Sequence, residues 1–119
     1  SDTTKDIADL MLNSAVSIEI HDSQSDELIA KYGDKSSIDK VNAILDIENW
    51  EKVENIDKNI NPIYTLELYY DTTKQDVNDD IKEITIYSNG EYASFFTASP
   101  GGVKQNYKTN IDIAELIDK

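Results

Sequence analysis

The alternation of apolar and polar residues predicts most of the secondary structure of this chain. In several segments an apolar residue occupies every second position, as Val16, Ile18 and Ile20 do, which is typical of strands that bury one face. The segments with this pattern are 16–21, 28–32, 63–70, 81–88 and 91–97, and residues 50–54 have the charged composition of a short edge strand. We therefore expect a sheet of four to six strands.

Three other segments repeat their apolar residues with the spacing of an amphipathic helix. The longest predicted helix covers residues 36–48, and Ser36 begins a sequence that resembles a capping box. Short terminal helices are expected at 5–12 and at 110–118, the second capped by Asn110. Together the elements predict an α+β fold, a mostly antiparallel sheet with one main helix packed across one face.

The clearest local signal is the dipeptide Asn89-Gly90, which separates two of the predicted strands. Asn-Gly favours a two-residue type I′ turn, because both central residues of that turn need a positive φ. Such a turn sets the register of the two strands, with Tyr87 opposite Tyr92 and Ile84 opposite Phe95.

Length and charge narrow the classes of function. A chain of 119 residues fits a single domain. It carries 11 basic and 24 acidic residues, and the net charge of −13 argues against a nucleic-acid partner and against anionic membrane surfaces. No apolar run approaches the roughly 20 residues that span a bilayer, so we expect no direct membrane insertion. Because the sequence starts at Ser1 without an initiator methionine, we expect residues 1–119 to be a single domain, a processed or trimmed fragment of a longer protein.

The sequence offers little material for catalysis or metal binding. It has no cysteine and a single histidine, His21, which the strand pattern places on the polar face of its strand. Asp76, Asn78 and Asp80 copy the first ligand positions of a calcium loop, but Ile81 stands where that loop needs glycine. We therefore predict no catalytic residue, no metal site and no cofactor.

One group of aromatic residues is a candidate binding surface. If the core face of the sheet holds the aliphatic residues, the opposite face of the same strands carries Tyr69, Tyr87, Tyr92 and Phe96. Aromatic residues on an uncovered sheet face can anchor a protein partner or stack on sugars. The alternative is that a terminal helix or a long loop covers these rings, which would make them ordinary core.

The order of the elements resembles a known group of domains. The residues that carry the likeness are Ser17 to Asp22, Ile38 to Leu45, Pro62 to Leu66 and Ile84 to Gly90. They resemble small domains of unknown function in surface lipoproteins and other exported proteins of low-GC Gram-positive bacteria. The resemblance implies an extracellular or cell-surface location and brings no catalytic residue with it. No lipobox cysteine is present in this sequence.

These features predict a non-catalytic cell-surface module that binds a protein or a cell-wall glycan. The alternative is an acidic inhibitor or immunity protein that blocks a basic enzyme, because opposite charges accelerate association. An enzyme is not expected. The sequence leaves the ligand and the oligomeric state open.

Overall fold

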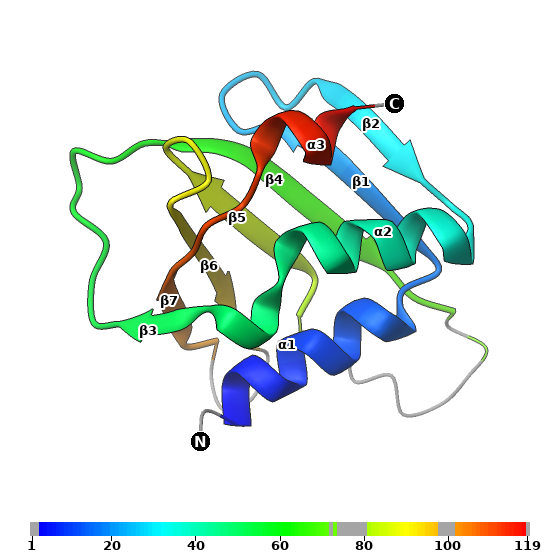
Figure 1. The fold of residues 1–119 in the computed structure, drawn as a ribbon, viewed down its shortest axis with the longest axis horizontal. Coiled ribbons are helices and arrows are strands. Elements are labelled where there is room, and N and C mark those ends of the chain that lie inside the picture. The colour runs from blue at the N-terminus through cyan, green and yellow to red at the C-terminus, as the bar shows by residue number, and fades with distance from the viewer. Residues whose placement is uncertain (1–2, 72, 74–80, 98–101, 119) are drawn as a thin grey trace.

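Seven strands and three α-helices form in the part of the chain that the computed structural model describes, residues 3–71, 73, 81–97 and 102–118. In chain order the elements are α1 (Thr3–Ser14), β1 (Ser17–Asp22), β2 (Leu28–Tyr32), α2 (Lys35–Leu45), the 3-10 helix η1 (Ile47–Asn49), β3 (Glu51–Val53), β4 (Pro62–Tyr69), β5 (Glu83–Tyr87), β6 (Tyr92–Phe96), β7 (Lys104–Lys108) and α3 (Ile113–Ile117). All seven strands join one antiparallel sheet in the order β2-β1-β4-β5-β6-β7-β3 (Figure 1). The predicted α+β class is confirmed.

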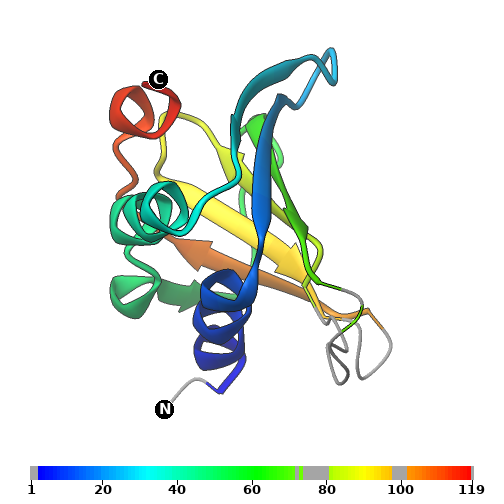
Figure 2. The ribbon, with the colours of Figure 1, turned by 90° about the vertical axis from the view of Figure 1, so that its right-hand side faces the viewer.

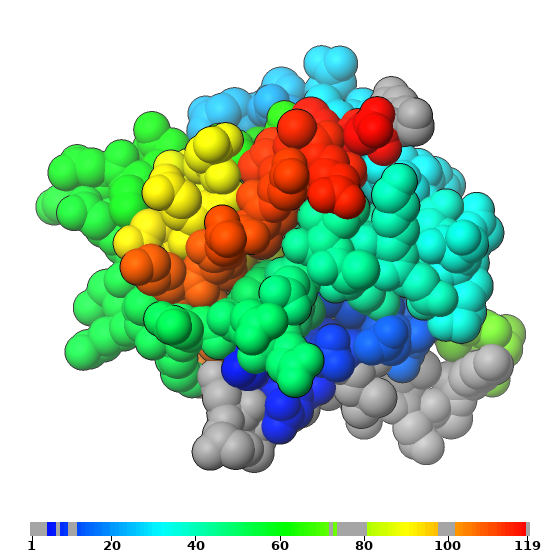
Figure 3. Space-filling model, in the orientation of Figure 1, coloured from blue at the N-terminus to red at the C-terminus, as the bar shows by residue number. Residues whose placement is uncertain are grey.

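The helices lie on one face of the sheet only. Seen from the side, α1, α2 and α3 lie on one side of the strands, and no described helix lies on the other (Figure 2). In the space-filling view the residues of the helices cover this face of the sheet (Figure 3). Alternation along the strands directs the aliphatic side chains into this interface. The fully buried residues there include Leu12, Ile18, Ile20, Leu66, Ile84, Ile86, Phe95, Tyr107 and Leu116.

The sheet contains one strand more than the four to six that the sequence predicts. The unpredicted strand is β7, whose sequence Lys-Gln-Asn-Tyr-Lys has one buried residue, Tyr107. The Tyr107 ring stacks on Phe95 with centroids 5.5 Å apart and packs against Trp50 at 5.6 Å. Because β7 joins the sheet through one ring and its backbone pairing with β6 and β3, hydrophobic periodicity does not reveal it.

The second helix begins and ends at other residues than the sequence suggests. Asp34 is the N-cap of α2, and its carboxylate accepts a hydrogen bond from the Ser37 N–H at 2.8 Å. The predicted capping box at Ser36 is therefore wrong. The predicted helix 36–48 ends at Leu45, after which the chain forms η1.

The two terminal helices also differ in detail from the prediction. In α3 the N-cap is Asp112, which accepts from the Glu115 N–H at 3.1 Å, and not Asn110. With 12 residues α1 is as substantial as α2 with 11, so the description of one main helix with short terminal ones is too simple. In the described ranges, no helix has the length and apolar character needed to cross a membrane.

The β5–β6 hairpin has the predicted register. Tyr87 pairs with Tyr92 and Ile84 pairs with Phe95. The core-facing residues of the two strands are therefore the ones that their alternation indicates.

The turn of this hairpin differs from the predicted type. Four residues instead of two join β5 to β6. Positive φ occurs at Ser88 and Gly90, whereas a type I′ turn needs it at Asn89 and Gly90. Bonds from other segments hold this conformation, because the Ser88 N–H donates to the Asn61 carbonyl at 2.8 Å and the Ile111 N–H donates to the Gly90 carbonyl at 2.9 Å.

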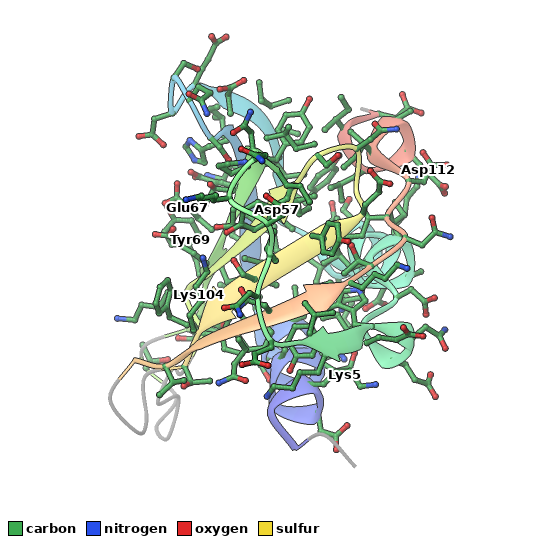
Figure 4. The ribbon with its side chains drawn as sticks, turned by 90° about the vertical axis from the view of Figure 1, so that its left-hand side faces the viewer. Lys5, Asp57, Glu67, Tyr69, Lys104 and Asp112 are labelled. Atoms are coloured by element: carbon green, nitrogen blue, oxygen red, sulfur yellow. The ribbon has the colours of Figure 1, made fainter. Side chains whose placement is uncertain are left out.

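The β3–β4 connection, residues 54–61, passes from one edge of the sheet toward its middle. β3 is the edge strand beside β7, and β5, β6 and β7 lie between it and β4. At the start of the connection the Asn106 side-chain amide donates to the Glu54 carbonyl at 3.2 Å. Figure 4, where Asp57 marks the connection, shows it running in front of β6 and β7.

Candidate functional site

The sheet face without helices, which we call the open face, is the candidate functional surface. Residues that alternate with core residues along β1, β4, β5, β6 and β7 lie on it. Figure 4 shows Glu67, Tyr69 and Lys104 on the side opposite Asp112, which precedes α3. The residues of the open face include Ser17, Glu19, His21, Thr65, Glu67, Tyr69, Glu83, Thr85, Tyr87, Tyr92, Ser94, Phe96, Lys104, Asn106 and Lys108.

The four aromatic residues singled out from the sequence all belong to this face, and no described helix covers them. Tyr69 is 43% exposed and Phe96 is 58% exposed. Tyr87 and Tyr92 are half-buried, and Tyr87 pairs with Pro62, which directly follows the β3–β4 connection. Within the described part of the chain, the alternative that a terminal helix covers these rings is therefore wrong for all four, and the side chains of Tyr69 and Phe96 are exposed.

The strand register divides these aromatic residues into two groups. Tyr87 and Tyr92 pair directly next to the hairpin turn. Phe96 is four residues further along β6, at its other end, where it pairs with Lys104. Tyr69 is the last residue of β4 and pairs with Ser17 of β1. The predicted four-membered surface is thus a pair beside the turn and two exposed rings near the opposite end of the sheet.

Tyr87 has a structural contact that its alternation alone does not indicate. Its hydroxyl lies 3.0 Å from the Ser94 Oγ, and Ser94 is only 2% exposed although it belongs to the open face. The Lys104 Nζ lies 5.7 Å from the centre of the Tyr87 ring, within reach of a cation–π interaction. Tyr87 therefore stabilises the sheet itself, which makes it a poor choice for testing binding separately from folding.

A polar cluster that the sequence did not reveal lies on β1 and β4. The His21 Nε2 is 2.9 Å from Glu19 Oε1 and 3.0 Å from Glu67 Oε2. One ligand atom from each of the three residues can be chosen so that all lie within 4.8 Å of one another. The three side chains are partly shielded, with 14% of His21, 21% of Glu19 and 29% of Glu67 exposed. Such a set of carboxylate and imidazole atoms can hold a proton or a metal ion.

The surrounding residues orient this cluster. The His21 Nδ1 lies 3.0 Å from the Asp26 carbonyl, so Nδ1 carries the hydrogen and donates it. Asp26 reaches this position with a φ of 62° in the turn between β1 and β2. The Tyr69 hydroxyl donates to Glu67 Oε1 at 3.1 Å, which leaves Glu67 Oε2 directed at His21.

These contacts change the acid–base properties of two groups. The pKa of His21 is raised above its ordinary value, first by the hydrogen bond to the Asp26 carbonyl and then by the one to Glu19. The pKa of Tyr69 is also raised, first by partial desolvation and then by its bond to Glu67. The acceptor atoms around His21 therefore favour its protonated form, whereas partial burial and the neighbouring carboxylate both favour the neutral form of Tyr69.

Three glutamates lie side by side across adjacent strands. Glu19 of β1 pairs with Glu67 of β4, and Glu67 pairs with Glu83 of β5. Like charges directly opposite one another in a sheet are unfavourable. The Lys31 Nζ lies 3.8 Å from Glu19 Oε2 and offsets one end of this glutamate row.

The sequence pattern predicts that two members of this cluster share a face, but it does not predict the third. In Glu19-Ile20-His21 the alternation already places Glu19 and His21 on one face. Glu67 joins them only through the pairing of β1 with β4, which local patterns do not predict. The calcium-like residues Asp76, Asn78 and Asp80 lie outside the described residues.

Comparison of the chain with family models, with curated proteins and with solved structures found no match. The resemblance to exported bacterial domains therefore stays a prediction.

Proposed function

We propose that this protein is a non-catalytic binding module that docks a basic protein partner on its open face. The observation that carries the proposal is the pair of exposed aromatic residues, Tyr69 and Phe96, on a sheet face that no described helix covers. Exposed aromatic rings on a regular surface are typical anchors of protein interfaces. The extracytoplasmic, cell-surface location expected from the resemblance belongs to the same proposal.

The charge of the molecule supports a basic partner rather than a neutral glycan. The chain has a net charge of −13, and the glutamate row Glu19, Glu67 and Glu83 lies on the same face as the two exposed rings. A partner with a complementary basic patch would associate faster and would be selected over acidic proteins.

The environment of His21 supports a binding role without catalysis. A general base needs a reacting hydroxyl or a substrate proton within hydrogen-bond reach. Both ring nitrogens of His21 instead face acceptor atoms, the Asp26 carbonyl and two carboxylates. The nearby Ser23 and Thr65 hydroxyls bond to each other at 3.1 Å.

An inhibitor or immunity protein is the second candidate, and the same charge supports it. Blocking a basic enzyme requires a fast-associating acidic surface, which the glutamate row on the open face provides. The two candidates differ in what happens to the partner, because an inhibitor abolishes the partner's activity and a surface module leaves it unchanged.

Capture of partners with matched variants tests the proposal. The double substitution Tyr69→Ser and Phe96→Ser removes both exposed rings, whereas the control Leu28→Ser removes an equally exposed apolar side chain (50%) from the edge strand β2. From an extract of exported proteins, the wild type and the control should retain the same basic partner, and the double variant should lose it. The wild type should retain less of this partner when salt is added, because screening weakens the attraction between opposite charges. Equal recovery by all three proteins, or recovery of an acidic partner, would contradict the proposal.

A further inference from the structure

We infer that Glu19, His21 and Glu67 form a binding site for a borderline transition-metal dication, with Zn²⁺ as the best-fitting ion. The inference goes beyond the docking of a protein partner, and it stands on the convergence of three ligand atoms from two paired strands. All three side chains come from β1 and β4, which pair over six residue positions inside the sheet. The ligand positions are therefore set by backbone pairing rather than by a loop.

The tautomer of His21 suits a metal ligand. Because Nδ1 donates to the Asp26 carbonyl at 3.0 Å, the neutral ring carries its lone pair on Nε2. Metal-binding histidines commonly have this arrangement, in which the nitrogen that does not bind metal donates to a carbonyl or a carboxylate. In the structure Nε2 faces the acceptor oxygens Glu19 Oε1 and Glu67 Oε2. A dication bound between these three atoms would displace the Nε2 hydrogen that the carboxylates accept, and the freed lone pair would then coordinate the ion.

The carboxylates are arranged as one-oxygen ligands. The Tyr69 hydroxyl occupies Glu67 Oε1, which leaves Oε2 for the ion, and Lys31 lies 3.8 Å from the second oxygen of Glu19. Zinc–nitrogen and zinc–oxygen bonds of about 2.0–2.2 Å separate tetrahedral ligands by roughly 3.4 Å. The observed distances of 2.9 and 3.0 Å therefore need to open by only a few tenths of an ångström.

Charge favours a dication over a proton at this position. Two carboxylates converge on one ring nitrogen, and a single N–H hydrogen cannot point directly at both oxygens. A protonated imidazole supplies one positive charge, whereas a dication matches both carboxylates. Glu83, opposite Glu67 in the glutamate row, adds further negative potential.

The ligand set selects the class of ion. An imidazole nitrogen suits zinc and the later transition metals, whereas calcium and magnesium prefer six or more oxygen ligands. Three protein ligands on a partly exposed surface leave the fourth tetrahedral position to water.

The experiment is a titration of the metal-free protein with Zn²⁺ alone, followed by calorimetry and by NMR of the imidazole nitrogens. His21 is the only histidine in the chain, so its ring signals need no assignment. We expect one Zn²⁺ per chain, a large shift of the Nε2 signal, and an Nδ1 that keeps its hydrogen. Magnesium or calcium in excess should not displace the zinc.

Variants distinguish coordination of the ion by these three side chains from non-specific attraction to an acidic surface. Glu67→Gln and His21→Asn each remove one ligand and should weaken Zn²⁺ binding by at least about tenfold. The matched control Glu83→Gln removes the same charge as Glu67→Gln from the same row without removing a ligand, and it should change affinity by less than about threefold. Circular dichroism establishes that each variant is folded, and Glu19→Gln replaces His21→Asn if that variant is not.

Three results would overturn the inference. The first is the absence of saturable Zn²⁺ binding by the wild type. The second is binding that leaves the His21 signals unmoved, which would place the ion elsewhere. The third is an equal loss of affinity in Glu67→Gln and Glu83→Gln, which would reduce the effect to attraction by an acidic surface.

Discussion

At the scale of single residues, Gly90 has less room for a side chain than Gly33 or Gly102. It has a φ of 91°, and a Cβ added there would lie 2.0 Å from the Ile111 carbonyl oxygen. Its own carbonyl accepts from the Ile111 N–H at 2.9 Å and from the Thr109 hydroxyl at 2.7 Å. Gly90 therefore joins the β5–β6 turn to the segment between β7 and α3, and it needs both its conformational freedom and its small size.

We predict that Gly90→Ala lowers the free energy of unfolding by more than about 2 kcal/mol, since left-handed strain and a clash with backbone add together. Urea denaturation followed by circular dichroism measures this change.

Two other glycines separate these causes. Gly102 also has a positive φ, 68°, but a Cβ added there would lie 3.8 Å from the nearest atom, the Thr97 carbonyl oxygen. Gly102→Ala should therefore lower the free energy of unfolding by about 1 kcal/mol, from backbone strain alone. Gly33 has nothing within 4 Å and no positive φ, so Gly33→Ala should change stability by less than about 0.5 kcal/mol. If Gly90→Ala lowers the free energy of unfolding no more than Gly102→Ala does, the close approach of the Ile111 carbonyl does not destabilise the variant.

At the scale of elements, the side chains of Asp34 and Trp50 bond to the two ends of α2, and both residues lie outside the predicted helix 36–48. Asp34 accepts from the Ser37 N–H at 2.8 Å and from the Ser37 hydroxyl at 3.2 Å. At the other end the Trp50 indole N–H donates to the Leu45 carbonyl at 2.7 Å, and Asp46 has a left-handed φ of 51°. These bonds satisfy backbone groups that the helix itself leaves without a partner.

We predict that Asp34→Ala lowers the free energy of unfolding by about 1 kcal/mol, because it removes the N-cap of α2. Ser36→Ala should leave stability nearly unchanged, since Ser36 is an exposed residue inside the helix and alanine is a good helix former. Thermal unfolding of the two variants in parallel distinguishes the observed cap from the capping box that the sequence suggests. A larger loss in Ser36→Ala than in Asp34→Ala would contradict the assignment.

At the scale of the whole molecule, the net charge of −13 is distributed unevenly over the sheet. Glu83 faces Glu67 across β4 and β5, which is a repulsive pair. Glu51 faces Lys108 across β3 and β7, which is an attractive pair. The same charge reversal at these two positions should therefore have opposite local effects.

We predict that Glu83→Lys raises the free energy of unfolding by about 0.5 kcal/mol and that Glu51→Lys lowers it by about the same amount. Both variants change the net charge of −13 by two units, so the difference between them measures the local pairs and not the overall repulsion. Urea midpoints at low salt provide the measurement, and added sodium chloride should reduce the difference. Stabilisation by both substitutions would mean that overall charge outweighs the pairing across strands.

What the sequence alone determined is the local pattern. The faces of the strands, the register of Tyr87 with Tyr92 and the placement of four aromatic residues away from the helices follow from a period of two residues. The α+β class follows from the order along the chain of the segments whose apolar residues repeat with the spacing of a strand or of a helix. These features are predictable because each depends on residues that are close together along the chain.

Only the tertiary structure decided the features that depend on distant residues. β7 belongs to the sheet because Tyr107 meets Phe95 and Trp50, and the turn at Gly90 departs from type I′ because Asn61 and Ile111 bond to it. The cluster of Glu19, His21 and Glu67 exists because β1 pairs with β4, although β2, α2 and β3 separate these two strands in the sequence. Periodicity assigns a side chain to a face, but the pairing of strands far apart in sequence decides which side chains meet there.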